Sequence, residues 1–506
     1  MSPTKSTPYP SSELFASNAP RTFTGPDLLQ IAFPIGGIGA GCISLNGTGG
    51  VQDFAIHGTP AVTAMPDGHI SSDCAFATLY FPELGIARLV EGPMPPERIY
   101  NQGLKNQGFR EGGHEGFPRF RECAFRGEYP LATVQLSDPK LPLAVEISGF
   151  NPFIPLDDRS SSIPCAILEY RLANTSAQPV PYEFSFHLSH LAHEGKGRQF
   201  GLTRNATIPG SGAFLYNIED PNATAYGSCA LGVIGHAPQI KTMWFRGGWF
   251  DSLSALWKEI SSGTFTANDG ANAAASQGRN GASILMEGVL QPGESITYPV
   301  VLSWYFPNMH YTYGELKNES DASVHTNTEH GAGEEDCADG DCVCPPPNWR
   351  PYYAGQWIDA RDVFEFVRDN YATLRGRTQA FHDALFRSSL PGYVIDAVSA
   401  NLGILKSPTV LRQENGNVWA WEGCFCDSGC CHGSCTHVWN YAQALPHLFP
   451  ALERTLREQE LYRSMDEKGH ISFRSALPDG PTNHTFHAAS DGQLGGIMKI
   501  YREWQI

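Results

Sequence analysis

Residues 182–189 read YEFSFHLS, an unbroken alternation of apolar and polar side chains. Residues 143–148 (LAVEIS) and 166–172 (AILEYRL) show the same alternation. Because successive side chains of a strand point to opposite faces, each segment is expected to bury one face and expose the other. Three half-buried strands are therefore predicted.

Turn-forming residues separate these segments, at 174–176 (NTS), 209–212 (PGSG) and 291–294 (QPGE). The strand pattern extends from about residue 75 to 310, and we expect no helices between its strands. Many short strands joined by tight turns are typical of an antiparallel β-sandwich. The fold class predicted for this part of the chain is therefore an N-terminal β-sandwich.

An acidic stretch follows the strands. The residues from Glu319 to Asp341 include many acidic side chains and no Lys or Arg, and three prolines follow. Such a stretch is typical of a solvated linker or loop. We therefore divide the chain into a sandwich domain (1–316), an acidic linker (317–354) and a helical domain (355–506).

Apolar residues recur at helical spacing after the linker. About five helices are expected, over residues 363–385, from Pro391, over 436–449, over 450–465 and from 490 to the end. Pro446 is expected to end or kink the third of them. Ser490 or Asp491 is expected to cap the last.

The composition excludes several classes of function. Lys plus Arg number 35 and Asp plus Glu number 52, so the net charge is −17. An electrostatic nucleic-acid binder or a protein docked on an anionic membrane needs a basic surface instead. No apolar run is long enough to span a membrane, and the first twenty residues lack the apolar core of a secretory signal. A cytoplasmic enzyme is therefore expected.

Residues 34–41 read PIGGIGAG and invite comparison with a phosphate-binding loop. They lack the GxGxxG spacing and the Gly-Lys-Ser/Thr ending of such loops, and no βαβ unit surrounds them. Tight turns or a close approach of two backbones explain these glycines better.

Residues 419–437 read WAWEGCFCDSGCCHGSCTH and are the most unusual in the chain. Five Cys and two His could hold zinc, but the spacing lacks the paired CxxC knuckles of common structural sites. We expect reduced thiols packing a tight loop, or an adventitious disulfide, with no bound metal or cofactor.

Glu422 stands between Trp419 and Trp421 on one side and a glycine-rich loop on the other. Indole rings stack on sugars and a carboxylate acts at the anomeric carbon, but a Glu beside Trp, taken alone, fits a structural role better.

Several motifs together resemble glycoside hydrolase family 116, which contains bacterial β-glucosidases and non-lysosomal glucosylceramidases. They occur in order along nearly the whole chain: residues 33–41 with Asp53, His57 and Gly58; 129–132 (YPLA); 149–157 (GFNPFIPLD); 421–423 (WEG); 435–441 (CTHVWNY); 449–453 (FPALE); 491–493 (DGQ); and Tyr501 with Arg502. The resemblance implies a β-sandwich followed by an (α/α)6 barrel, and a retaining β-glycosidase acting on β-linked glycosides.

The resemblance also implies roles for individual residues. Glu422 corresponds to the family's nucleophile, and Trp421, Thr436, His437 and Asp491 would bind or support the sugar. Retaining hydrolysis needs a second carboxyl group about 5–5.5 Å from the nucleophile. In the family this acid/base Asp comes from a later loop, so we expect it beyond Ile506 and the barrel to be incomplete. The alternatives are a non-catalytic carbohydrate-binding protein and a zinc-stabilised scaffold.

Overall fold

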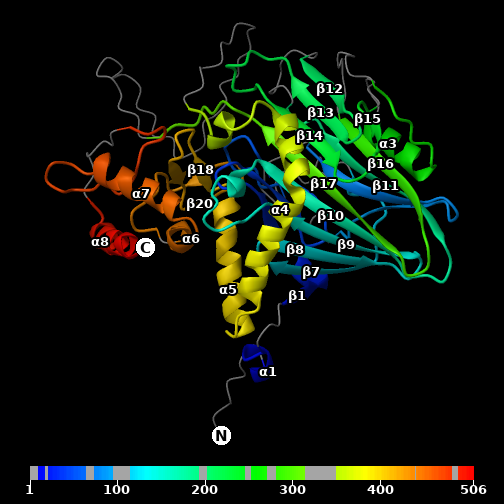
Figure 1. Cartoon of the computed structure of the whole chain (residues 1–506), viewed down its shortest axis with the longest axis horizontal. Helices are drawn as coiled ribbons and strands as arrows, with labels where there is room; N and C mark the ends of the chain where they lie inside the picture. Colours follow the sequence, from blue (N-terminus) through cyan, green and yellow to red (C-terminus); the bar gives the residue numbers. More distant parts are fainter. Residues whose placement is uncertain are drawn as a thin grey trace, which may run out of the picture.

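The computed structural model describes residues 10–16, 21–63, 73–94, 114–192, 202–244, 252–269, 281–313, 349–438, 440–480 and 488–506. The expected acidic linker lies mostly outside these residues, as does Trp439. The described strands form an N-terminal part with large antiparallel sheets, and most of the helices follow it (Figure 1).

The larger sheet has nine strands. In spatial order they are β1 (Thr22–Thr24), β7 (Glu122–Glu128), β8 (Leu131–Ser137), β9 (Leu143–Phe150), β10 (Cys165–Asn174), β17 (Ser295–Tyr305), β14 (Ser228–Val233), β13 (Gly212–Asn217) and β12 (Thr203–Ile208). The second sheet contains β15 (Gln239–Lys241), β16 (Gly281–Leu290), β11 (Val180–Ser189), β5 (Ala75–Phe81) and β6 (Ile86–Leu89). A third, smaller sheet contains β2 (Ala32–Gly36), β3 (Cys42–Asn46) and β4 (Val51–Ala55). All of these strand pairs are antiparallel.

The two large sheets share one apolar core, which confirms the predicted sandwich packing. The ring of Phe184 in β11 stacks on Tyr298 of β17 with centroids 5.2 Å apart, and it lies 5.1 Å from Tyr170 of β10. The hydroxyl groups of Tyr182 and Tyr298 hydrogen-bond at 2.6 Å, so these phenols keep a polar partner inside the core. The three strands predicted from period-two alternation are β9, β10 and β11.

One prediction for this part was wrong, because helix α3 (Ser252–Ser261) lies among the strands. Its Leu253, Leu256 and Ile260 are buried against β5 and β6. These three residues follow helical spacing, but the segment is short and is surrounded by strand patterns. The helical period of this short segment was therefore overlooked among the alternating patterns of the strands on either side.

The glycines of residues 34–41 permit close packing at the joint between the two parts of the chain. A Cβ on Gly39, whose φ is +68°, would lie 2.3 Å from Cβ of Arg412. A Cβ on Gly37 would lie 2.5 Å from the carbonyl carbon of Ser162. Close backbone approach is thus confirmed as the reason for these glycines.

The helical half contains α4 (Ala360–Phe386), α5 (Gly392–Leu402), α6 (Asn440–Leu448), α7 (Pro450–Tyr462) and α8 (Ser490–Gln505) among its described residues. Short strand pairs β18 (Val410–Arg412) with β19 (Val418–Ala420), and β20 (Gly423–Cys424) with β21 (Gly429–Cys430), lie between α5 and α6. A short helix α1 (Ser11–Leu14) and the 3-10 turns Gly25–Leu28, Ser160–Ser162, Tyr352–Gly355 and Gly403–Lys406 complete the described elements. Figure 1 shows α4 lying along the sandwich and α6, α7 and α8 beyond it.

Several helix ends differ from those expected. Helix α6 begins at Asn440 rather than residue 436, because the N–H of Thr436 donates to the carbonyl of Phe473. Pro446 lies inside α6, which ends only two residues later. Helix α8 is preceded by Ala489, so neither Ser490 nor Asp491 is its cap.

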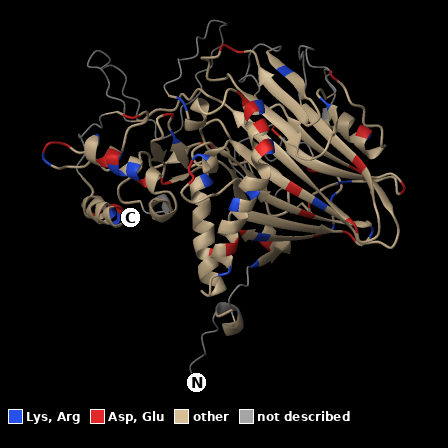
Figure 2. Cartoon of the chain, viewed as in Figure 1, with Lys and Arg blue, Asp and Glu red and all other residues tan. Residues whose placement is uncertain are grey.

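Helix α7 carries acidic and basic positions side by side (Figure 2). Its buried Glu453 accepts from Arg502 of α8 at 3.0 Å, and Nε of Arg457 lies 3.1 Å from the same carboxylate. These ion pairs join the last two helices. Within the described residues, no helix has both the length and the apolar character needed to cross a bilayer.

Candidate active site

Glu422 lies immediately before the β20–β21 hairpin, two residues after the end of the buried strand β19. Its backbone N–H donates to the carbonyl oxygens of Cys430 and Cys431, each at 3.1 Å. The preceding N–H, of Trp421, donates to Thr409 at 3.0 Å. The backbone is therefore held on both sides, whereas the Glu422 side chain is 28% exposed. A fixed backbone with an accessible carboxylate is what a positioned nucleophile requires.

Trp421 does not take the sugar-binding position that was expected of it. Its indole is fully buried, as is that of Trp419, and the two rings meet edge to face at 5.1 Å. Indole Nε1 of Trp421 lies 3.1 Å from Nδ1 of His432. A Cβ on Gly429 would lie 2.1 Å from the same indole, so only glycine fits there. Trp421 thus packs against Gly429 of the hairpin, and its indole ring has no face open to a sugar in this structure.

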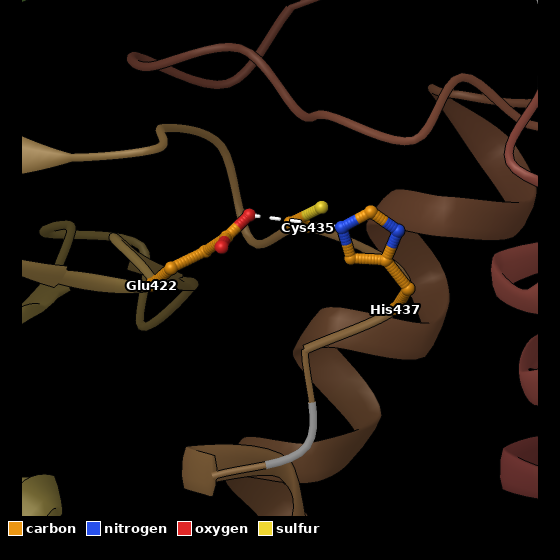
Figure 3. A group of neighbouring side chains, drawn as sticks. All are labelled: Glu422, Cys435 and His437. Atoms are coloured by element: carbon orange, nitrogen blue, oxygen red, sulfur yellow. Dashed lines mark ion pairs between the residues drawn. The ribbon is translucent and has the colours of Figure 1, made fainter.

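His437 lies close to Glu422, and Asp491 lies beside His437. Nε2 of His437 is 3.8 Å from Oε1 of Glu422, and its Nδ1 is 3.7 Å from Oδ1 of Asp491. Glu422 comes from the hairpin and His437 from the turn before α6, and their side chains point toward one another in Figure 3. Asp491 lies in the first turn of α8 and is largely exposed. The imidazole therefore bridges two carboxylates.

Thr436 is buried and contacts the protein rather than an open site. Nζ of Lys499 donates to its carbonyl at 2.8 Å. A Cβ on Gly492 would lie 2.2 Å from the Thr436 hydroxyl, so the start of α8 packs directly on this residue. Thr436 is thus placed to hold His437 in position and to join α8 to the site.

Two neighbours of Glu422 were not identified from the sequence. Nη2 of Arg474 lies 4.0 Å from Oε1 of Glu422, while its Nη1 donates to the carbonyl of His432 at 2.6 Å. The thiol of Cys435 hydrogen-bonds Glu422, and burial together with this carboxylate raises the pKa of Cys435 to about 11. Arg474 stands alone in an irregular segment with no periodic pattern. The only signal for Cys435 was its place in the Cys-rich stretch.

The cysteines of this loop carry reduced thiols and are not in disulfide bonds. Sγ of Cys430 and Sγ of Cys431 lie 3.1 Å apart, and their hydrogen bond raises the pKa of Cys430 to about 11. The loop also contacts the N-terminal part of the chain, because the N–H of Val62 donates to the carbonyl of Cys426 at 2.6 Å. The loop that follows Glu422 therefore contacts the N-terminal part of the chain directly.

Several solved structures align with the chain at low TM-scores and low sequence identity. A protein assigned as a kojibiose phosphorylase from the human microbiome aligns with 98% of the chain (TM-score 0.42, 9% identity), and the chain covers 57% of that protein's length. A galactose mutarotase-like protein from Clostridium acetobutylicum aligns with 56% of the chain and 98% of its own length (TM-score 0.29, 8% identity). A polysaccharide lyase aligns with 55% of the chain and 32% of its own length (TM-score 0.25, 13% identity). No curated protein sequence matches the chain.

A family model gives the stronger result. The model described as beta-glucosidase 2, glycosyl-hydrolase family 116 N-terminal domain, matches residues 32–374. The match covers more than half of the chain, from the sandwich into α4, and ends before the hairpin that carries Glu422. The chain therefore belongs to glycosyl-hydrolase family 116.

Proposed function

We propose that the chain carries the nucleophile of a retaining β-glycosidase of the β-glucosidase or glucosylceramidase type, and that Glu422 is this nucleophile. One observation carries the proposal. In a family 116 chain, a backbone-fixed and accessible carboxylate lies within 4.0 Å of both an imidazole and a guanidinium. Arg474 is always charged and attracts the Glu422 carboxylate, which favours a defined orientation of the nucleophile.

In the proposed reaction, an oxygen of Glu422 attacks the anomeric carbon as the bond to the leaving oxygen breaks. Water then attacks the same carbon of the glycosyl-enzyme and releases the sugar and the free carboxylate. In this proposal, His437 and Asp491 contact hydroxyl groups of the sugar. Thr436, which packs against the start of α8, would hold these two residues in position.

The second carboxyl group of a retaining enzyme acts first as an acid and then as a base. Since the family resemblance places it far after the nucleophile in sequence, we propose that it belongs to a segment following residue 506. We further propose that α4 to α8 form part of an (α/α)6 barrel. The substrate class and the activity of the whole protein rest on these proposals.

The experiment that tests the nucleophile does not require the second carboxyl group. A 2-deoxy-2-fluoro-β-glucoside with a dinitrophenolate leaving group needs no proton on departure, and its fluorine slows hydrolysis of the covalent intermediate. We expect the 506-residue chain to gain the mass of one fluorosugar, on the peptide that contains Glu422. Glu422→Gln should gain none, whereas the matched control Glu414→Gln, an exposed residue paired with Arg350, should react as the parent does.

Other outcomes distinguish the alternatives. An adduct on a different carboxylate would eliminate Glu422 as nucleophile. Saturable binding of glucosides without any adduct, on a folded chain, would favour a non-catalytic carbohydrate-binding protein. Where trapping succeeds, azide should partly restore turnover of an activated glucoside by Glu422→Ala, because the small anion can occupy the place of the missing carboxylate.

A further inference from the structure

The geometry points to a binding site for a thiophilic divalent cation, represented by Zn²⁺, formed by Glu422, Cys435 and His437. One ligand atom from each of these residues lies within 4.8 Å of the other two (Figure 3). Among the residues that the structure describes, this is the one such group of three or more possible ligands. Thiolate, imidazole and carboxylate are the three ligand types that zinc takes in proteins.

The distances suit a tetrahedral ion. Zinc bonds of 2.0–2.3 Å separate neighbouring ligand atoms by about 3.3–3.8 Å. Oε1 of Glu422 and Nε2 of His437 are already 3.8 Å apart. Glu422 also hydrogen-bonds the Cys435 thiol, so the separation that remains to be closed is the one between Cys435 and His437, which is at most 4.8 Å. A movement of no more than about 1 Å is needed, and rotation of the partly exposed His437 side chain can supply it. Three protein ligands would leave a fourth position for water.

A carboxylate also lies beside the second nitrogen of the His437 ring. Imidazole ligands of zinc usually direct their other ring nitrogen to a carboxylate or a carbonyl group. Nδ1 of His437 faces Oδ1 of Asp491 at 3.7 Å, on the side away from Glu422. Asp491 would therefore orient the ring and increase its basicity.

The backbone holds the ligands in place before any ion binds. The N–H groups on either side of Cys435 donate to Ala420 at 2.8 Å and to Phe473 at 3.0 Å. Cys435 is itself buried, so its thiol has little freedom. Preorganised ligands of this kind lower the cost of assembling a metal site.

Arg474 opposes a cation, since its guanidinium lies 4.0 Å from Glu422. Nη1 of Arg474 donates to the carbonyl of His432, and the guanidinium carbon lies 5.1 Å from the centre of the Phe473 ring. These two contacts hold the guanidinium beside the three ligands and not between them. We therefore infer a reversible site of moderate affinity. An ion there would occupy the lone pairs of Glu422 and block glycosyl transfer, a consequence that rests on the proposed function, whereas metal binding itself does not.

The test uses the whole chain, reduced and stripped of metal, titrated with Co²⁺ and with Zn²⁺ against a chromophoric chelator. We expect one equivalent of Co²⁺ to give a thiolate-to-cobalt charge-transfer band with tetrahedral d–d bands, which Zn²⁺ abolishes. Cys435→Ser should lose the charge-transfer band and bind Zn²⁺ at least tenfold more weakly. Cys424→Ser, an exposed cysteine of the same loop, is the matched control and should keep both. Asp491→Asn should weaken binding by roughly tenfold.

The proposal is overturned if no stoichiometric cobalt band forms, or if the band survives Cys435→Ser and disappears in Cys424→Ser. His437→Gln gives an independent readout should Cys435→Ser fail to fold, because it keeps the thiol and should change the d–d bands. Zn²⁺ should also prevent trapping of Glu422 by the fluorosugar, and a chelator should restore it. Trapping of the fluorosugar without any cobalt band would refute the metal site and leave the proposed nucleophile intact. A cobalt band without trapping would refute the proposed nucleophile and leave the metal site intact.

Discussion

Helices α4 and α8 are both amphipathic, but they use their apolar residues in opposite ways. Val363, Phe364 and Val367 of α4 are fully buried against the nine-stranded sheet. On α8, Ile497 and Met498 are 65% and 66% exposed. The residues that α8 buries are instead Gly492, Gly495, Gly496 and Lys499. A helical period therefore predicts that an apolar stripe exists, and it does not predict that the stripe is covered.

The contacts of α8 explain the difference. It is anchored by Arg502 on Glu453, by Lys499 on the carbonyl of Thr436, and by the close approach of Gly492 to Thr436. Small and charged residues thus face the protein, and large apolar ones face outward in the part of the chain that the structure describes. Contiguous apolar surface of this kind is uncommon on monomeric proteins and usually marks a contact surface.

The largest expected effect comes from truncating the buried stripe of α4. The ring of Phe364 lies where a Cβ on Gly232 would be 2.3 Å away, so the space around it is filled. Phe364→Ala should lower the free energy of unfolding by about 3–5 kcal/mol, through lost burial and a new cavity. Met498→Ala on α8 should change it by less than about 0.5 kcal/mol. Urea unfolding followed by tryptophan fluorescence measures both, and equal losses would show that the α8 face is covered in solution.

The second prediction concerns the buried anchor of α8. Glu453→Gln leaves the guanidinium groups of Arg457 and Arg502 without their shared carboxylate and should cost about 3 kcal/mol. The control is Arg454→Gln, which removes a more exposed pair with Glu503 and should cost about 0–1 kcal/mol. Hydrogen exchange should show faster opening of α8 in the first variant only. Unchanged exchange would mean that glycine packing, and not this carboxylate, holds the helix.

Two glycines of α8 should respond with opposite signs. Gly492→Ala places a methyl group 2.2 Å from the Thr436 hydroxyl and should destabilise the chain by about 1–3 kcal/mol. A Cβ on Gly496 would meet nothing within 4 Å, so Gly496→Ala should stabilise the helix by about 0.5–1 kcal/mol. Thermal unfolding of the two variants provides the measurement. The same sign in both would refute the close contact between α8 and Thr436.

The smallest effect is a pH dependence where α4 meets β7. Nε2 of His382 lies 3.3 Å from Oε2 of Glu128. The hydrogen bond from His382 lowers the pKa of Glu128 below 4.5, against the effect of burial. Burial lowers the pKa of His382, but its contacts with Glu128 and Asp383 outweigh this and raise it above 6.5.

The two shifts define a pH window for this contact. Glu128 contributes stability above its unfolded pKa and loses it as the pH falls, whereas His382 contributes below its unfolded pKa and loses it as the pH rises. Their joint contribution is therefore largest between about pH 4.5 and 6.5. His382→Gln should cost about 1 kcal/mol within this window and less at alkaline pH. A loss that is constant from pH 5 to 9 would contradict the charged pair.

Much of this architecture could be predicted from local patterns. Alternation located β9, β10 and β11, and the helical period located α4, α7 and α8. The family motifs pointed to Glu422, His437 and Asp491, and in the structure His437 lies within 4 Å of both carboxylates, while the roles of the three residues stay predictions. Each of these signals lies within a few residues of sequence, or in a motif that the family shares.

Other features depend on contacts between distant segments. Trp421 was expected to face a sugar, yet it is buried, because Gly429 and His432 of the following hairpin close over it. The spacing of the cysteines does not indicate the proposed zinc site, because two of its three possible ligands, Glu422 and His437, are not cysteines. Side-chain periodicity reports which face of an element is apolar, because it follows from backbone geometry alone. Which residues meet across elements was decided by hydrogen bonds such as those from the backbone of residues 434 and 436 to Ala420 and Phe473, which only the folded chain can form.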